Sequence, residues 1–415
     1  MVTDRFAALG FIVPDQQDEQ ANWLARFNAR RFGQKTIYPL IAVTTGCNIG
    51  CTYCYEAGVQ ATTMSKETIV HVLNWMRRRV VDDGVTEINP GLFGGEPLLY
   101  PELLFQIMDG HKAICQKYGA TGSFYTSSNG MLLTPDLART LARRGLRQIQ
   151  ISLDGPKSIH DLRRITKRGS ATYDQSLRGL RVALKFVASV TLKINFDRQN
   201  LDAMTELLDF VSEDPELRQV TVKLEAIAYQ MPASKVNHPA DLVIPPESTE
   251  MADAYAKLSL MCKTRDLKVT NDTAHTTPCM FSSHHGVIIG PAGNIYKCIS
   301  LVGRRDLAVG SVYDCTYDED AYNRQMNSKK KLTDCFDEKC AYIPVCAGGC
   351  AYESVIRGAD VTDRYCTKDY LERYHYLRHL IRHQSILEDL GMVPLTAEEL
   401  SRASGNGCRG CKNGG

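Results

Sequence analysis

The 415-residue chain lacks the features that would assign it to a membrane, to secretion or to nucleic acid. No run of about 18 apolar residues occurs, so we expect no membrane-spanning helix. The N-terminal stretch MVTDRFAALGFIVPDQQDEQ has no basic segment followed by a long apolar one, and therefore predicts no secretory signal. A net charge of +2, without a concentrated basic stripe, argues against nucleic acid as the main partner. We expect a cytoplasmic protein.

Cysteine, in contrast, is abundant. The chain has 15 cysteines, and eight of them lie between Cys279 and Cys366. An odd number of cysteines in a protein without an export signal points to metal binding rather than to disulfides. The cysteines are therefore candidate metal ligands.

A fourth ligand is missing from the first cysteine group. Cys47, Cys51 and Cys54 have the spacing C-x3-C-x2-C, and no further Cys or His stands nearby to complete a tetrahedral zinc site. Three thiolates on a four-iron cluster leave one iron open. The pattern therefore favours an iron–sulfur cluster over structural zinc, with a substrate or cofactor in the open position.

From residue 38 to residue 223, short β-rich segments alternate with amphipathic helical patterns, in about six units. Such alternation predicts an α/β fold, a partial (β/α)6 TIM-type barrel with its site at the carboxyl ends of the strands. The later cysteines predict a second, small domain organised by metal. We expect five divisions of the chain: an N-terminal arm (1–36), the barrel (37–230), a connector (231–274), the Cys-rich domain (275–370), and a C-terminal helix and tail (371–415).

The first cysteine group, with Tyr53 before Cys54, resembles the signature of the radical S-adenosylmethionine (SAM) superfamily. Two further stretches agree with this resemblance. GGEP resembles the family motif whose backbone contacts the SAM amino group, and ISLDGP resembles the segment near the SAM ribose, followed by a matching basic residue. The SAM-binding residues that the resemblance implies are Gly94, Gly95, Glu96, Pro97, Ser152, Asp154 and Arg164.

This resemblance extends over about residues 38–225 and implies a mechanism. In the family, SAM chelates the open iron of a 4Fe–4S cluster, the cluster donates one electron, and the resulting 5'-deoxyadenosyl radical takes hydrogen from the substrate. Ser152 and Asp154 are also good turn residues, so a purely structural role for them stays open. The sequence assigns no catalytic residue.

The later cysteines resemble the SPASM domain, which holds two auxiliary 4Fe–4S clusters in peptide-modifying radical SAM enzymes. The match implies three clusters in all. Auxiliary cluster I would be bound by Cys279, Cys298 and Cys350, and auxiliary cluster II by Cys335, Cys340, Cys346 and Cys366. Cluster I then lacks a fourth Cys, so an open iron, or His284, His285 or Cys315 as ligand, remain alternatives, as does zinc. The role of Cys408 and Cys411 in the tail stays open.

The resemblance implies a maturase of a ribosomally synthesised precursor peptide (a RiPP maturase), which installs a thioether or carbon–carbon cross-link. The alternative is an anaerobic sulfatase-maturating enzyme, which forms formylglycine. Those relatives have an Asp where this chain has Ile299, and they have a further Cys soon after the position of Cys279. Both differences favour cross-linking. Expected partners are the precursor peptide, a flavodoxin- or ferredoxin-type electron donor and, for leader recognition, the N-terminal arm or a separate protein.

Overall fold

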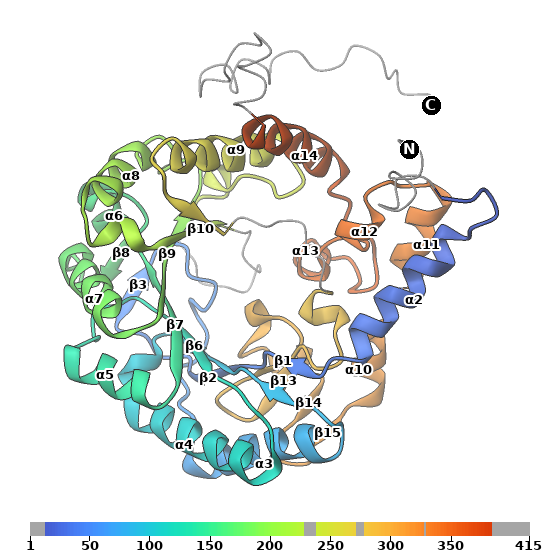
Figure 1. Ribbon diagram of the computed structural model, residues 1–415, viewed down its shortest axis with the longest axis horizontal. Coiled ribbons are helices and arrows are strands. Elements are labelled where there is room, and N and C mark those ends of the chain that lie inside the picture. Colours follow the sequence, from blue (N-terminus) through green and yellow to red (C-terminus); the bar gives the residue numbers. More distant parts are fainter. Residues whose placement is uncertain (1–12, 228–237, 271–277, 328, 384–415) are drawn as a thin grey trace, which may run out of the picture.

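The computed structural model describes residues 13–227, 238–270, 278–327 and 329–383. Six parallel strands form the centre of the fold (Figure 1), and they are the six strands that the sequence predicts. Each is parallel to its neighbour in the order in which they occur along the chain. Their bounds are β2 (Leu40–Thr44), β5 (Gly91–Gly94), β6 (Phe124–Ser128), β7 (Leu146–Ser152), β9 (Ser189–Phe196) and β10 (Thr221–Ala226). The expected partial TIM-type barrel is thus confirmed.

Proline interrupts two of the predicted strand segments. Pro39 separates β1 (Thr36–Ile37) from β2, and Pro90 separates β4 (Glu87–Ile88) from β5. Proline has no N–H to donate to a strand ladder, so each segment breaks there. The two short leading pieces, β1 and β4, pair with each other in a separate parallel ribbon.

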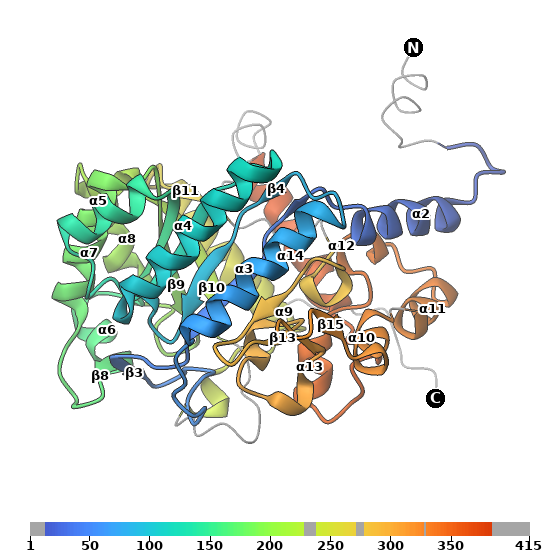
Figure 2. The ribbon, with the colours of Figure 1, turned by 90° about the horizontal axis from the view of Figure 1, so that it is seen from below.

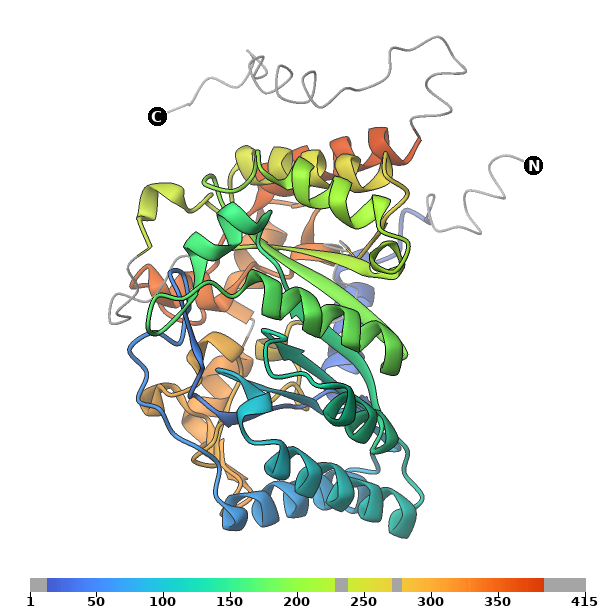
Figure 3. The ribbon, with the colours of Figure 1, turned by 90° about the vertical axis from the view of Figure 1, so that its left-hand side faces the viewer.

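The helices cover the outer face of the strands, as Figure 3 shows. The first of them begins after Ser65, whose hydroxyl accepts a hydrogen bond from the Thr68 N–H and so caps the helix. Val72 and Met76 of its apolar stripe are fully buried against the sheet. The outer helices are α3 (Lys66–Val81), α4 (Pro101–Tyr118), α5 (Pro135–Arg143), α6 (Lys157–Arg163), α7 (Tyr173–Phe186) and α8 (Met204–Glu213).

The segment expected to be a connector adds to the barrel. It contains the helix α9 (Thr249–Lys263), and β11 (Lys268–Val269) follows and pairs in parallel with β10. The predicted C-terminal helix, α14 (Lys368–Arg382), packs along α9, where Arg373 pairs with Asp253 at 2.7 Å. The rest of that predicted helix, and Cys408 and Cys411, lie outside the described residues.

The Cys-rich region is joined to the barrel by a continuous sheet, which the sequence does not reveal. Strand β12 (Ile288–Ile289) lies parallel to β2, and β13 (Asn294–Tyr296) returns antiparallel to it as a hairpin. Further along the chain lie β14 (Gly310–Ser311), β15 (Thr316–Tyr317), α10 (Glu319–Met326), α11 (Lys329–Asp337), α12 (Ile343–Cys346) and α13 (Ala351–Ile356). The barrel residues Ala42 and Phe93 pack with side chains of this region, including Tyr296 and Tyr352, in one apolar cluster.

The described part of the N-terminal arm is a helix, α2 (Glu19–Phe32), that runs along the Cys-rich region (Figure 2). Phe27 packs in an apolar cluster with Leu332, Cys335 and Ile343. Antiparallel strands β3 (Ile49–Cys51) and β8 (Arg164–Thr166) and six single 3-10 turns complete the described elements; the turns are Pro97–Leu99, Leu217–Gln219, Ala240–Leu242, Met280–Ser282, Ile299–Leu301 and Arg305–Leu307. No helix in these residues is long and apolar enough to cross a membrane.

The junction between the barrel and the Cys-rich region is testable by truncating Ile289 of β12, which is fully buried between Ile41 and Ile295. We expect Ile289→Ala to lower the free energy of unfolding by about 2–5 kcal/mol, because it leaves a cavity in a shared core. Denaturation in urea measures this, with Val70→Ala, at a position that is 63% exposed on α3, as the control. Equal midpoints for the two variants would contradict a buried junction.

Candidate active site and metal centres

The three cysteines of the first group converge on a loop after β2. The Cys54 N–H donates to the Cys51 carbonyl oxygen at 3.2 Å, and β3 pairs with β8 so that Cys51 stands opposite Arg164. Burial, strengthened by the neighbouring thiols and carboxylates, raises the pKa of Cys47 to about 11 and that of Cys54 to about 12. Three thiols placed together in this way become stable thiolates only when a cation binds them, which fits an iron–sulfur cluster.

The GGEP motif presses against the start of this cysteine loop. A Cβ atom on Gly94 would lie 2.0 Å from the Thr44 carbonyl oxygen, and one on Gly95 would lie 2.4 Å from the Gly46 carbonyl oxygen. The loop therefore requires glycine at both positions. This close approach places the backbone of the motif beside the three cysteines.

Glu96 of this motif faces the protein interior. It is fully buried, and its carboxylate accepts hydrogen bonds from the Leu98 N–H at 3.0 Å, the Ser128 hydroxyl at 2.8 Å and the Asn129 N–H at 2.7 Å. Asn129 in turn donates to Asn48, next to Cys47, at 2.7 Å. Glu96 thus fixes the loops after β5 and β6 against the cysteine loop.

Asp154 and Arg164 meet at the centre of a buried hydrogen-bond network. Asp154 is fully buried and accepts from the Asn195 N–H at 3.1 Å, the Asn195 side-chain amide at 2.9 Å and the Tyr53 hydroxyl. Arg164 donates to the Tyr53 hydroxyl at 2.7 Å and lies 3.7 Å from Asp154. Burial acts to raise the pKa of Asp154, but the charges of Arg164 and Arg163 prevail and hold it below its usual value.

Two members of this network escape prediction from the sequence. The sequence marks Tyr53 only as the aromatic residue of the cysteine motif. In the structure its hydroxyl links Asp154 and Arg164 to the cysteine loop. Asn195 lies on β9, the fifth barrel strand, and its side-chain amide donates hydrogen bonds to both Asp154 and Tyr53. Its only signal is a polar residue near the end of an apolar strand. Ser152, at the end of β7, is buried next to this network.

The inner face of β9 and β10 is charged. Lys193 and Asn195 of β9 stand beside Lys223 and Glu225 of β10, and alternate residues of each strand share one face. Glu225 lies 2.9 Å from Lys223 and 3.7 Å from Lys193. These three side chains keep between about a quarter and two-fifths of their surface exposed. A substrate entering beside the cysteine loop therefore meets a polar wall.

Cys279, Cys298 and Cys350 are also neighbours. Burial and the two neighbouring thiols raise the pKa of Cys298 to about 12. Cys350 immediately precedes α13 and accepts hydrogen bonds from the N–H groups of Tyr352 and Glu353, although burial still raises its pKa to about 11. The thiol donor set and the helix N-terminus both suit an anionic cluster.

The loops of the two cysteine groups touch each other. A Cβ atom on Gly303, in the loop after Cys298, would lie 2.5 Å from the Cγ1 of Val59, in the loop after Cys54. Tyr55 lies in the first of these loops, and burial raises its pKa well above the ordinary value.

The alternative fourth ligands of the second group have other neighbours. The His284 Nδ1 lies 2.5 Å from the Tyr322 hydroxyl, and the His285 Nδ1 lies 3.9 Å from Asp83. Both imidazoles come within 4.8 Å of Asp83, which Arg79 already pairs with at 2.8 Å. Cys315 donates to the Val312 carbonyl oxygen at 3.2 Å. Each of the three side chains thus has a polar partner within the protein that is not one of the predicted cluster ligands.

The remaining four predicted ligands line one small cavity together. Cys335, Cys340, Cys346 and Cys366 surround it, with Arg364 and Tyr342 beside them. The Cys340 N–H donates to the Cys335 carbonyl oxygen at 3.0 Å, so the x4 spacing closes into a turn. Four converging thiols can hold either a 4Fe–4S cluster or zinc.

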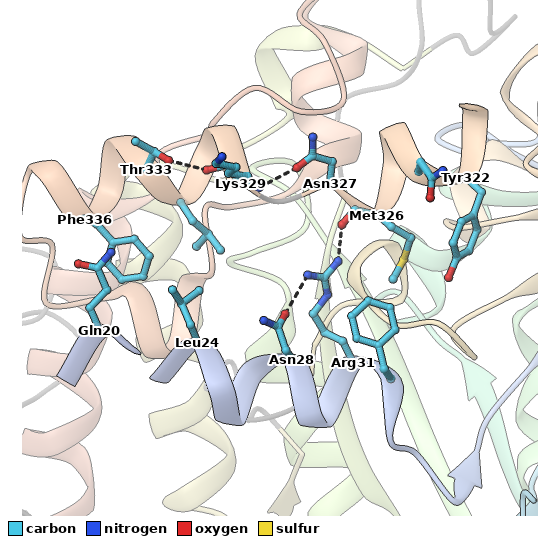
Figure 4. A pocket seen from close by; sticks show the side chains of 13 residues that line it. Gln20, Leu24, Asn28, Arg31, Tyr322, Met326, Asn327, Lys329, Thr333 and Phe336 are labelled. Atoms are coloured by element: carbon cyan, nitrogen blue, oxygen red, sulfur yellow. Dashed lines mark hydrogen bonds between the residues drawn. The ribbon is translucent and has the colours of Figure 1, made fainter. Parts of the chain in front are cut away.

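A groove of about 510 Å³ lies between α2 and the α10–α11 segment (Figure 4). Arg31 anchors its floor, because its guanidinium donates to the carbonyl oxygens of Ser282, at 2.7 Å, and Met326. Apolar side chains of both walls, among them Leu24 and Phe336, face it. The groove thus adjoins both the loop after Cys279 and the helix that carries Cys335.

Comparison with known proteins identifies the class of the barrel. Residues 41–211 match the model of the Radical SAM superfamily. The chain therefore contains a radical SAM domain, as the three motifs predict, and this family implies a 4Fe–4S cluster and SAM. Among curated proteins, the AdoMet-dependent heme synthase of Methanosarcina barkeri is 21% identical over 367 residues, which cover 80% of this chain and 94% of that protein.

Solved structures share the fold over most of the chain. The structure of native anSMEcpe with bound AdoMet covers 83% of this chain and 99% of its own, with a TM-score of 0.65 at 19% identity. Streptococcus suis SuiB bound to the precursor peptide SuiA covers 84% of this chain and 79% of its own, with a TM-score of 0.59 at 14% identity. The family model matches residues 41–211, which are less than half of the chain, whereas the anSMEcpe structure covers 83% of it. The structural similarity therefore extends past the barrel into the Cys-rich region.

The buried network predicts a sharp difference between two aspartates. Asp154→Asn removes the counter-charge of a buried arginine, and we expect a loss of about 3–5 kcal/mol of unfolding free energy. Asp174→Asn breaks an exposed ion pair with Lys157 and should cost at most about 1 kcal/mol. Thermal denaturation of both variants measures the difference. A loss for Asp154→Asn no larger than that for Asp174→Asn would show that Arg164 does not depend on this carboxylate.

Proposed function

We propose that this protein is a radical SAM maturase that installs a cross-link, a thioether or a carbon–carbon bond, in a ribosomally synthesised precursor peptide. The observation that carries the proposal is the contact between the loop of the first cysteine group and the loop that follows Cys298, where Gly303 lies against Val59. A substrate between these groups would contact the SAM site on one side and an auxiliary cluster on the other. SuiB, which shares the fold, has been solved with a precursor peptide, and this supports a peptide substrate.

The cysteines would hold three 4Fe–4S clusters in the sets that the sequence predicts. The first cluster, with SAM, supplies a 5'-deoxyadenosyl radical when bound. Around it, Gly94 and Gly95 bring backbone groups close to the cysteine loop, while Asp154 and Tyr53 orient Arg164. We infer a cytoplasmic enzyme that receives electrons from a flavodoxin- or ferredoxin-type donor, with leader recognition by the N-terminal arm or by a separate protein.

The chain's own polar residues give the substrate its surroundings. Glu225, between Lys193 and Lys223, stands opposite Asn195, which contacts Tyr53 of the cysteine loop. A carboxylate there can accept hydrogen bonds from substrate N–H groups, and the two lysines can bind peptide carbonyl or carboxylate oxygens. Holding the reacting groups together lowers the entropic cost of their encounter.

Formylglycine formation is the alternative function, and the fold of the sulfatase maturase anSMEcpe keeps it open. Ile299 argues against it, because an isoleucine cannot serve as the base that an Asp provides in those relatives. The absence of a second Cys in the segment CMFSSHHG argues in the same direction. We therefore rank peptide cross-linking first.

The SAM-binding cluster is tested by replacing Cys47, Cys51 and Cys54 together with Ala. We expect the variant to lose all SAM cleavage, because thiolates are required ligands, and to keep the auxiliary clusters, because their ligands come from other elements. Chromatography of 5'-deoxyadenosine and iron analysis measure the two effects. Continued formation of 5'-deoxyadenosine in this variant would refute the assignment.

The substrate class is tested with short peptides encoded next to the gene and with a sulfatase-motif peptide. We expect the mass of a neighbouring peptide to fall by two hydrogens per cross-link, and the sulfatase peptide to remain unchanged. Mass spectrometry after anaerobic incubation with SAM and a reductant makes the comparison. Conversion of the sulfatase cysteine to formylglycine would reverse the ranking of the two functions.

A further inference from the structure

Three consecutive lysines open α11, and one of them differs from the others. Lys329 and Lys330 are exposed, whereas Lys331 is only 4% exposed. Lys329 lies at the groove beside α2 (Figure 4), and Lys330 pairs with Asp363 at the surface. Lys331 lies on nearly the opposite face of the helix from Lys329, because the two residues are two positions apart. A buried ammonium group costs several kcal/mol unless negative charge compensates it.

The stem of Lys331 packs against the segment that carries ligands of both auxiliary-cluster sets. A Cβ atom on Gly348 would lie 2.7 Å from both the Cγ and the Cδ of Lys331, so the lysine packs directly over this glycine. In the chain, Gly348 stands between Cys346, of the cluster II set, and Cys350, of the cluster I set. Lys331 also precedes Cys335 by one helical turn on α11.

The charged neighbours of Lys331 agree with this position. Burial lowers its pKa, and Arg31 adds to that effect, whereas the thiols of Cys279, Cys350 and Cys346 act to raise it. These three cysteines come from both sets. The negative groups that act on this buried cation are therefore cluster ligands, since no carboxylate is among its main electrostatic neighbours within the described residues.

We propose that Lys331 is a shared positive charge between auxiliary clusters I and II that favours their reduced forms. The inference rests on the two auxiliary clusters of the proposed function. Reduction adds one negative charge to a cluster, and a fixed cation nearby stabilises the added charge more in a dry interior than at the surface. Lys331 thereby raises the reduction potential of both clusters and assists their role as electron acceptors. It is a positioning and tuning residue rather than one that reacts.

The test is a redox titration of the reconstituted enzyme, followed by electron paramagnetic resonance, for Lys331→Met, Lys331→Arg and Lys329→Met. We expect Lys331→Met to shift the potentials of both auxiliary clusters to more negative values. Lys331→Arg, which keeps the charge, and Lys329→Met, which removes an exposed charge of the same helix, should leave both near the wild-type values. The potential of the SAM-binding cluster serves as an internal control and should not move.

Iron analysis separates failure of this inference from failure of the cofactor assignment. About twelve iron atoms per wild-type chain support three clusters, and about four would overturn the auxiliary clusters together with the role of Lys331. With about twelve iron atoms present, unchanged potentials of the auxiliary clusters in Lys331→Met would overturn the role of Lys331 and leave the three clusters in place. If Lys331→Met loses auxiliary iron, retention of that iron by Lys331→Arg supports the need for charge, and its loss from both variants would show that the lysine serves packing only.

Discussion

The structure depends on one electrostatic constraint, which is that thiols gathered in a protein interior repel one another once they are ionised. Burial and mutual repulsion raise the pKa of Cys47, Cys54, Cys298 and Cys350 to about 11 or 12. Such thiols are neutral near pH 7 unless a metal stabilises the thiolate. The fold buries these thiols close to one another, so binding of the clusters and stability of the folded chain must be coupled. The cationic groups placed beside these thiols, Arg164 and Lys331, serve the same need.

The topology of the sheet explains how one interior serves two groups of cysteines. The first group follows β2, and β12 attaches to that same strand and carries the hairpin that ends at Cys298. The neighbouring strands β9 and β10 contribute a charged inner face, while Ala42 and Phe93 of β2 and β5 are covered by the Cys-rich region. One side of the barrel is therefore closed by the second region, and the other side keeps polar groups that a peptide can contact.

Local patterns in the sequence were sufficient for the strands and helices of the barrel, whereas they do not reveal its long-range pairings. Alternating apolar segments and the Ser65 cap predict strands and helices, because both depend on near neighbours. The pairing of β12 with β2, and that of Cys51 with Arg164, join residues far apart in the sequence and leave no local signal. The same holds for Asn195 and Lys331, whose roles come from their surroundings. Zinc and iron also share thiol ligands, so the spacing alone does not choose between them.

The central claim is that ten cysteines form three separate iron–sulfur sites. Anomalous scattering at the iron edge, from anaerobic crystals of the reconstituted enzyme, tests it most directly. We expect three iron clusters, one at Cys47, Cys51 and Cys54, one at Cys279, Cys298 and Cys350, and one at Cys335, Cys340, Cys346 and Cys366. Iron at the first site alone, or a zinc signal at the other two, would contradict it.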